Sequence, residues 1–271
     1  MKRTRRSLIA TGGLGALALM GFLTAFAVGN AAQAEDALAR TKAKGVLEVC
    51  GVDGLLPYSS SDANTPGFEV EIARAMAAKM GVKAEYNWVT WDALIPALTS
   101  GRCDAIINGL FITEERLKVI DFTDPYYASG ETILVLKSDD SVHKVEDLKD
   151  KKVGALAGSV TVQFLEKAGI KDVVVYPDQN TIIIELNNKR IDATYLEAPS
   201  AAWAIQKDPT LNIKVVHDYI PEERWNAGVG VRKEDTALKA ELNTVIAGLI
   251  ADGTISKILE KYGIPFFPPK S

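Results

Sequence analysis

The sequence predicts an α/β fold with mostly parallel sheets and helices on both faces, because strand-like and helix-like segments alternate along residues 46–262. The alternation is interrupted once, by the highly charged stretch 138–152, which indicates a boundary between two parts. The pattern Leu-x-x-x-Arg-x-Asp-Ala occurs at 98–105 and again at 186–193, each time where a helix turns into a strand. This repeat is either a common helix–strand loop or a sign of two similarly built lobes. Two lobes would leave a cleft between them for a small ligand.

In the first half of the chain, an apolar face and a following Gly81 indicate a helix at 68–80. Thr90 can cap a helix at 91–100, in which Pro96 predicts a bend. The other elements expected here are strands at 46–52, 82–88, 103–108 and 132–136 and a short helix at 113–119.

The alternation restarts after the charged stretch. Short β-branched and apolar runs predict strands at 153–156, 173–176, 191–195, 213–216 and 227–231. Helical patterns fall between and after them, at 160–168, 181–188, 199–207, 235–251 and 254–262. The Pro-rich tail 265–269 is expected to be irregular.

The first 34 residues predict a cleavable export signal. An apolar stretch at 8–28 lies between a basic start and Ala32-Gln33-Ala34, which suits a cleavage site. The stretch is also long enough to remain as an uncleaved anchor. Arg5 and Arg6 loosely resemble a twin-arginine signal, so export through that route or the Sec route stays open. No Cys follows the cleavage site, so we expect no lipid anchor and a mature chain that begins near Glu35 in the periplasm.

Composition excludes several classes of function. The chain is 47% hydrophobic and 24% charged, an ordinary globular mixture. Without residues 1–34 it holds 27 basic and 35 acidic residues, so the net charge is −8 rather than −4, which argues against nucleic acid as a partner. Two histidines and two cysteines leave no cluster for a metal, and no P-loop, dinucleotide-binding or nucleophile motif is present. We expect no metal, no cofactor and a monomer.

The two cysteines are expected to be buried thiols. Cys50 lies late in strand 46–52, and Cys103 lies at the start of strand 103–108. If these strands are parallel neighbours, a rise of about 3.3 Å per residue separates the two sulfur atoms further than a disulfide tolerates.

The segment Asn-Gly-Leu-Phe-Ile-Thr-Glu-Glu-Arg at 108–116 is the strongest candidate site. A strand ends there, and Thr113 can cap a helix whose first turn holds Arg116. Free backbone N–H groups and a guanidinium would then face one space, an arrangement that suits a carboxylate. The residues alone favour the alternative, a surface Arg116 paired with Glu114 or Glu115.

Several segments resemble a known family. These are Gly-Phe-Glu-Val-Glu-Ile-Ala at 67–73, the stretch from Trp91 to Ile107, Ile-Thr-Glu-Glu-Arg at 112–116, Asp-Phe-Thr-Asp-Pro-Tyr-Tyr at 121–127 and the ending at 251–262. In this order and spacing they resemble the family 3 extracellular solute-binding proteins, the periplasmic amino-acid receptors of ABC importers. The resemblance covers about residues 42–263.

The resemblance implies a type II periplasmic binding protein. Its two lobes would be joined by two crossover hinge strands and would close on a small zwitterion. Lobe 1 would comprise residues 35–134 and 225–271, and lobe 2 residues 135–224. The implied partners are the ligand and the membrane subunits of an ABC permease.

The resemblance also implies the ligand-binding residues. Arg116 would bind the ligand carboxylate, and Glu197 would take the place of the acid that binds the ligand ammonium group. Val160 replaces a hydroxyl that is usual in the second lobe. The remaining contacts would come from backbone groups of the first lobe and hydroxyls of the second: Gly109, Leu110, Ser159 and Thr161.

Three aromatic residues leave the ligand open. Phe111 replaces the usual Ser or Thr and is similar to the ectoine-binding members of the family. Together with Tyr58 and Trp91 it could form an aromatic box that holds a diffuse cation. Those members also carry an acid at the position of Leu55, however, and Glu197 keeps the amino-acid pattern. The expected ligand is therefore a polar amino acid or a related zwitterion, with ectoine or a similar compatible solute as the alternative.

Other polar residues are expected to have structural roles. Glu69 and Glu71 begin helix 68–80 and would favour its dipole. Asp104 and Asp192 are expected to be turn residues.

Two other functions compete with that of a receptor. A dehydratase on the same scaffold would need a general acid in the cleft, for which Glu197 is the obvious candidate, but no base is apparent. A sensory ligand-binding module would need a signalling domain, and none follows in the sequence. We therefore expect a binding protein and not an enzyme.

Overall fold

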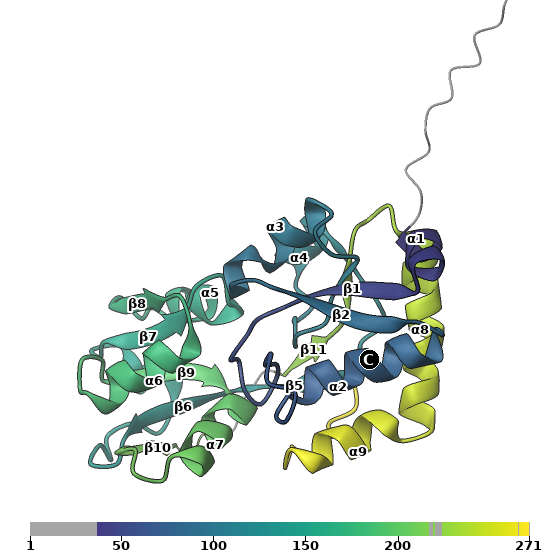
Figure 1. Cartoon of the computed structure of the whole chain (residues 1–271). Coiled ribbons are helices and arrows are strands. Elements are labelled where there is room, and N and C mark those ends of the chain that lie inside the picture. The colour runs from purple at the N-terminus through teal and green to yellow at the C-terminus, as the bar shows by residue number, and fades with distance from the viewer. Residues whose placement is uncertain (1–36, 217–218, 220–223, 265, 271) are drawn as a thin grey trace, which may run out of the picture. The chain divides into compact units, whose positions relative to one another are not determined.

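The computed structural model describes residues 37–216, 219, 224–264 and 266–270, all within one compact unit at 35–271 (Figure 1). The predicted export signal lies outside the described residues. Two five-stranded sheets and one two-stranded sheet are covered by helices, which confirms the predicted α/β class.

The first sheet has the strand order β2-β1-β3-β12-β4. Its strands are β1 (Val46–Gly51), β2 (Lys83–Trp88), β3 (Ala105–Ile106), β4 (Asp121–Phe122) and β12 (Gly230–Val231). The helices on this part are α1 (Ala37–Lys44), α2 (Phe68–Lys79), α3 (Leu94–Thr99), α4 (Glu114–Val119), α8 (Thr236–Ala251) and α9 (Thr254–Lys261). Among the described residues no single helix is long and apolar enough to cross a membrane, although α8 and α9, bent by 69° at their junction, meet that test together.

The second sheet has the strand order β10-β6-β9-β7-β8. Its strands are β6 (Glu131–Leu136), β7 (Val153–Leu156), β8 (Val173–Tyr176), β9 (Ala193–Glu197) and β10 (Ile213–Val215). Helices α5 (Val160–Lys167), α6 (Gln179–Asn187) and α7 (Ala198–Lys207) pack on it. A short 3₁₀ helix η2 (Val145–Leu148) lies in the charged stretch between β6 and β7.

In each five-stranded sheet four strands run in one direction and one is reversed, so the prediction of mostly parallel sheets is confirmed. β1 pairs in parallel with β2 and β3, and β7 with β8 and β9, but β12 and β6 are antiparallel to both of their neighbours. A parallel pairing needs a long crossover connection, whereas β6 and β12 enter their sheets directly after short strands. The strands that are joined through helices kept the predicted parallel direction.

Two short strands carry the chain between the sheets, as predicted. β5 (Tyr127–Ser129) leads from the first sheet to β6, and β11 (Trp225–Ala227) leads back to β12; the two pair antiparallel. The expected single strand at 227–231 is therefore two strands, because Ala227 pairs with Tyr127 while Gly230 pairs with the first sheet. The predicted lobe bounds stay a prediction. Strand β6 runs across the predicted boundary between residues 134 and 135.

The remaining differences in secondary structure are local. The helix expected at 91–100 is divided into a 3₁₀ turn η1 (Trp91–Ala93) and α3, so Pro96 falls in the first turn of a new helix, where its missing N–H costs nothing. Helix α1 and strand β4 were not predicted, and the first crossover strand was expected without residue bounds. The other predicted helices and strands are present with shifted ends.

The repeated Leu-x-x-x-Arg-x-Asp-Ala pattern has the same hydrogen bonds in both places. The Asp104 N–H donates to the Glu48 carbonyl (2.7 Å), and the Asp104 carboxylate accepts from the Glu48 N–H (3.3 Å). The Asp192 N–H donates to the Lys152 carbonyl, and its carboxylate accepts from the Lys152 N–H, both at 2.8 Å. Each Asp thus fixes the start of one strand against a neighbouring strand of its sheet. The shared hydrogen bonds support two halves with similar local structure.

Cys50 and Cys103 form a disulfide, so the prediction of two thiols was wrong. Their Cα atoms are 5.6 Å apart and both residues are buried. The prediction assumed that Cys103 belongs to the strand, but β3 begins only at Ala105. Cys103 lies in the connection from α3, so the rise per residue of a strand does not set its distance from Cys50.

Removing this disulfide is expected to destabilise the chain. The bond closes a loop across 53 residues, and the chain-entropy relation gives roughly 4 kcal/mol for a loop of that length. The variant Cys50→Ala/Cys103→Ala should lose about 2–4 kcal/mol of unfolding free energy in urea titrations. Wild-type chain treated with a reductant should show a similar loss, and an unchanged unfolding midpoint after reduction would contradict the cross-link.

Glu69 connects helix α2 to the first crossover, a role that the sequence did not suggest. Its carboxylate is fully buried and accepts hydrogen bonds from the hydroxyls of Tyr126 and Tyr127, both at 2.7 Å. Burial raises the pKa of Glu69 to about 7, although the two hydroxyls lower it. The expected role in the helix dipole is therefore secondary to this buried link.

Glu69 should make stability depend on pH. The folded chain keeps the Glu69 proton between about pH 4.5 and 7, where the unfolded chain has released it, so the free energy of unfolding should fall as pH rises through this window. Glu69→Gln should remove on the order of 2–3 kcal/mol of that fall, measured by urea unfolding at pH 5, 6, 7 and 8. Tyr127→Phe removes a group that lowers the Glu69 pKa and should steepen the fall. Equal slopes in all three proteins would show that Glu69 does not carry the effect.

Candidate functional site

A small cavity lies where β6 begins and β9 ends, between elements of the two five-stranded sheets. Leu55 and Trp91 line it from the first part of the chain. The rest of its lining comes from the part that forms the second sheet: Glu131, Leu156, Ser159, Thr161, Gln179, Tyr195, Leu196 and Glu197. Its volume is about 10 Å³, room for roughly one water molecule. Two carboxylates and an indole ring therefore share one narrow, mostly buried space.

Arg116, in the first turn of α4, lines a neighbouring cavity of about 240 Å³ that shares Ser159 with the narrow one. Thr113 caps that helix by accepting the Arg116 backbone N–H at 3.2 Å, as predicted. The guanidinium donates to the Phe111 carbonyl (2.7 Å) and to the Gly158 carbonyl (3.4 Å), so it bridges the loops before α4 and α5. It is 9% exposed, and no ion pair with Glu114 or Glu115 occurs among the described residues. The surface-pair alternative is thus not realised in the structure.

The Arg116 guanidinium stays charged and has further N–H groups that donate to no acceptor among the described residues. Burial lowers its pKa to about 10, while the charges of Glu197 and Glu115 act in the opposite direction. A guanidinium has five N–H donors, and the two hydrogen bonds above leave the others without an acceptor among the described residues. A carboxylate bound there would gain charge-assisted hydrogen bonds in a partly dry environment.

Glu197 is the last residue of β9 and directly precedes α7. Its side chain makes no capping hydrogen bond to α7 and lines the cavity instead. Burial raises the pKa of Glu197 to about 7, and the Tyr58 hydroxyl and the charge of Arg116 partly oppose this. The charges of Arg116 and Glu197 each shift the pKa of the other residue, so a buried cation and a buried acid lie close together.

The structure separates the three aromatic residues of the expected box. Trp91 lines the cavity, and the centre of its ring is 6.0 Å from the Arg116 guanidinium. The Tyr58 ring packs on Phe68 with its hydroxyl beside Glu197, although that hydroxyl lacks the geometry of a hydrogen bond. The Phe111 ring stacks instead on Trp225, 5.6 Å away between centres. None of these three rings stacks on another within the described part of the chain.

The expected backbone contacts belong to tightly packed segments. Gly109 has a φ of +68°, and a Cβ atom there would lie 2.7 Å from the Tyr58 ring, so only glycine fits. The Leu110 carbonyl accepts from the Gly228 N–H at 3.2 Å and so connects this loop to the second crossover. Gly109 packs against the Tyr58 ring and Leu110 bonds to Gly228, so their contribution to the site is to position these neighbours.

The hydroxyls expected from the second part of the chain are already bonded. Ser159 donates to the Leu156 carbonyl at 2.7 Å and can still accept. Thr161 donates to a carboxylate oxygen of Glu131 at 3.3 Å. Their proposed role in binding a ligand carboxylate stays a prediction.

Glu131 is the residue that sequence reasoning missed. It is the first residue of β6, 2% exposed, and stands directly opposite Glu197 in the antiparallel pairing of β6 with β9. A glutamate at the start of a predicted buried strand was a visible signal. Its pairing partner could not be known without the strand register.

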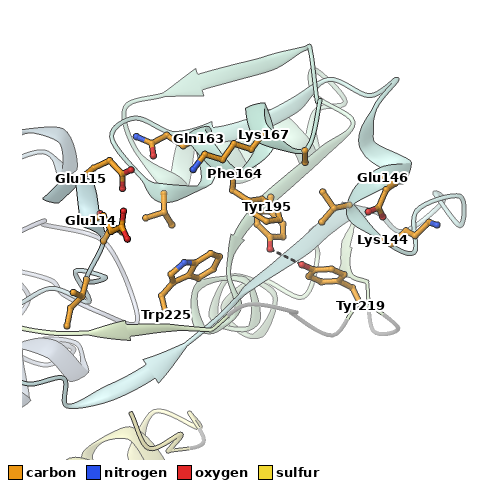
Figure 2. A pocket seen from close by; sticks show the side chains of 15 residues that line it. Glu114, Glu115, Lys144, Glu146, Gln163, Phe164, Lys167, Tyr195, Tyr219 and Trp225 are labelled. Atoms are coloured by element: carbon orange, nitrogen blue, oxygen red, sulfur yellow. Dashed lines mark hydrogen bonds between the residues drawn. The ribbon is translucent and has the colours of Figure 1, made fainter. Parts of the chain in front are cut away.

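A larger cavity of about 760 Å³, which shares Tyr195 with the narrow one, is shown in Figure 2. Trp225, Phe164, Tyr195 and Tyr219 line it, and the last two share a hydrogen bond between hydroxyls at 2.8 Å. Glu114 and Glu115 line it too, but none of the nine expected ligand-binding residues does. Four of the expected residues, Trp91, Ser159, Thr161 and Glu197, line the narrow cavity instead.

Comparison with known proteins agrees with this geometry. The family described as bacterial extracellular solute-binding proteins, family 3, matches residues 47–265. A histidine-binding periplasmic protein of Escherichia coli (strain K12) is 33% identical over 216 residues, covering 76% of this chain and 83% of that protein. The L-cystine-binding protein TcyJ of the same strain is 34% identical over 259 residues, covering 92% of this chain and 96% of that protein.

Solved structures agree with the relatives. An ancestral arginine-binding protein bound to arginine has a TM-score of 0.75 and 37% identity, covering 80% of this chain and 98% of that protein. The match extends through both five-stranded sheets, and the chain belongs to the bacterial extracellular solute-binding proteins of family 3.

Proposed function

We propose that this protein is the periplasmic substrate-binding component of an ABC importer for an amino acid, which it holds between Arg116 and Glu197. The observation that carries the proposal is the burial of one guanidinium and one carboxylate on two neighbouring cavities that share Ser159, each affecting the pKa of the other. A zwitterion supplies the complementary pair of charges, a carboxylate for Arg116 and an ammonium group for Glu197. Such charge-assisted hydrogen bonds contribute about 1.5–3 kcal/mol each.

Binding would require the elements around the cavity to separate and close again. A volume of about 10 Å³ is far too small for an amino acid. Opening would break the hydrogen bonds from Arg116 to Gly158 and from Asn180 to the Gly54 carbonyl (3.3 Å). The two crossover strands β5 and β11 are the natural hinge, and closure around the ligand would be the signal for the permease.

An amino acid fits the site better than ectoine does. An aromatic box is the feature that would favour ectoine, but Phe111 stacks on Trp225. Leu55, in the position where ectoine-binding members carry an acid, lines the cavity. The relatives named above are all amino-acid-binding proteins.

The proposal includes export and delivery. Residues 1–34, which lie outside the described residues, would direct the chain to the periplasm and be removed there. The mature chain would act as a monomer and present its ligand to the membrane subunits of the importer. The relatives are periplasmic or binding proteins by name, which supports this location.

We also propose that binding is its whole function. The raised pKa of Glu197 is a property that a dehydratase could use for acid catalysis, but the same residue has a sufficient role as partner of the ligand ammonium group. Turnover of a prephenate-like substrate by the purified chain would overturn this part of the proposal.

Arg116→Ala should weaken amino-acid binding at least 100-fold, because it removes two or more charge-assisted hydrogen bonds to the ligand carboxylate. A thermal-shift screen of amino acids, betaines, ectoines and opines first identifies a ligand, which should raise the melting temperature by mass action. Calorimetric titration of that ligand then compares the variant with wild type.

Two variants sharpen this comparison. Arg116→Lys keeps the charge but loses the planar fork, so its affinity should fall between those of wild type and Arg116→Ala. Arg190→Ala removes an exposed arginine that pairs with Glu185 and should bind like wild type. Near-wild-type affinity of Arg116→Ala would show that the carboxylate binds elsewhere.

A further inference from the structure

The cavity contains a second buried acid that the proposed binding mode does not use. Glu131 and Glu197 are directly opposite in the β6–β9 pairing, and both side chains line the same cavity. Directly opposed residues of an antiparallel pair have Cβ atoms about 4.5–5.5 Å apart, and like charges at such positions are destabilising. Two carboxylates have therefore been placed where an apolar pair would have been more stable.

Nothing described in the chain compensates Glu131. One of its carboxylate oxygens accepts from Thr161, and the other is buried without a hydrogen-bond partner. Burial and the charge of Glu197 both raise its pKa well above the ordinary value, and no described cation acts against them. A buried acceptor without a donor, aimed into a ligand cavity, indicates that the donor arrives with the ligand.

A count of charges indicates what that donor is. Arg116 is matched by a ligand carboxylate, and Glu197 by a ligand ammonium group. A neutral zwitterion leaves Glu131 with no partner, so Glu131 must then stay protonated, because an unpaired buried charge is costly. A ligand with a second cationic nitrogen would allow both glutamates to ionise.

We infer that Glu131 is a specificity-determining residue that makes the site prefer amino acids with a second positively charged nitrogen over neutral ones. This inference rests on the proposed function and extends it from amino acids in general to cationic ones. The Trp91 ring lines the same cavity and offers a face for such a cation. The Gln179 side chain also lines it and can accept hydrogen bonds from the same group.

The test compares two ligands of nearly equal shape, L-arginine and the neutral L-citrulline, with L-ornithine as a shorter cation. Wild type should bind arginine or ornithine at least 10-fold more tightly than citrulline in calorimetric titrations at pH 7.5. Glu131→Gln keeps the size of the side chain and should weaken the cations at least 10-fold while changing citrulline less than 3-fold. Glu197→Gln should weaken all three ligands, because each carries the α-ammonium group.

A control variant and a measurement on wild type keep the test valid even if Glu131→Gln folds poorly. Glu146→Gln alters an acid on the larger cavity and should leave the preference unchanged. Wild type titrated in two buffers of different ionisation enthalpy should release more protons on binding arginine than on binding citrulline, since only the cation favours ionised Glu131.

The outcomes separate this inference from the proposed function. If amino acids bind and depend on Arg116 but wild type shows no preference for cations, the inference is wrong and the proposed function stands. Equal weakening of arginine and citrulline by Glu131→Gln would assign Glu131 a structural role and would overturn the inference too. If no amino acid binds wild type at all, the proposed function itself fails.

Discussion

Burial of charge is the constraint on which the site depends. Arg116, Glu131 and Glu197 are each less than 10% exposed, and Glu69 is fully buried near them. An ionised group removed from water is stable only with partners, and no described cation acts on Glu131, so the described residues alone do not satisfy this arrangement. The raised pKa values of the acids are the consequence, since protonation is the alternative to a missing cation. In the proposed function, an amino acid would supply the missing partner charges.

The fold provides this arrangement through the ends of its elements. Glu197 ends a strand, Glu131 begins the neighbouring one, and Arg116 lies in the first turn of a helix capped by Thr113. Strand ends and helix starts present side chains and free N–H groups in one direction, which is why open α/β sheets bind ligands there. The crossover strands join the two halves close to this point, and Glu69 fixes the first crossover to α2 through two tyrosine hydroxyls. Rigid anchoring next to the site suits a hinge, because motion is then confined to the few residues that connect the sheets.

Residues of the site contact each other through a small number of partners. The Arg116 guanidinium bonds to the carbonyls of Phe111 and Gly158, which come from the loops before α4 and α5. Phe111 stacks on Trp225 of the second crossover, so a change at the hinge reaches the loop that holds Arg116. In the proposed function, these contacts would couple closure to ligand binding.

The sequence by itself determined the alternation of strands and helices, the Thr113 cap before Arg116 and the family segments, because these depend on local periodicity and on residue types at short spacing. It also indicated Arg116 and Glu197 as partners of a zwitterion. Only the tertiary structure decided the mixed strand directions, the Cys50–Cys103 disulfide, the stacking of Phe111 on Trp225 and the burial of Glu69. Glu131 is the clearest case, since its importance lies in its register against Glu197, 66 positions along the chain. Register and burial are set by contacts between distant segments, and no local pattern contains them.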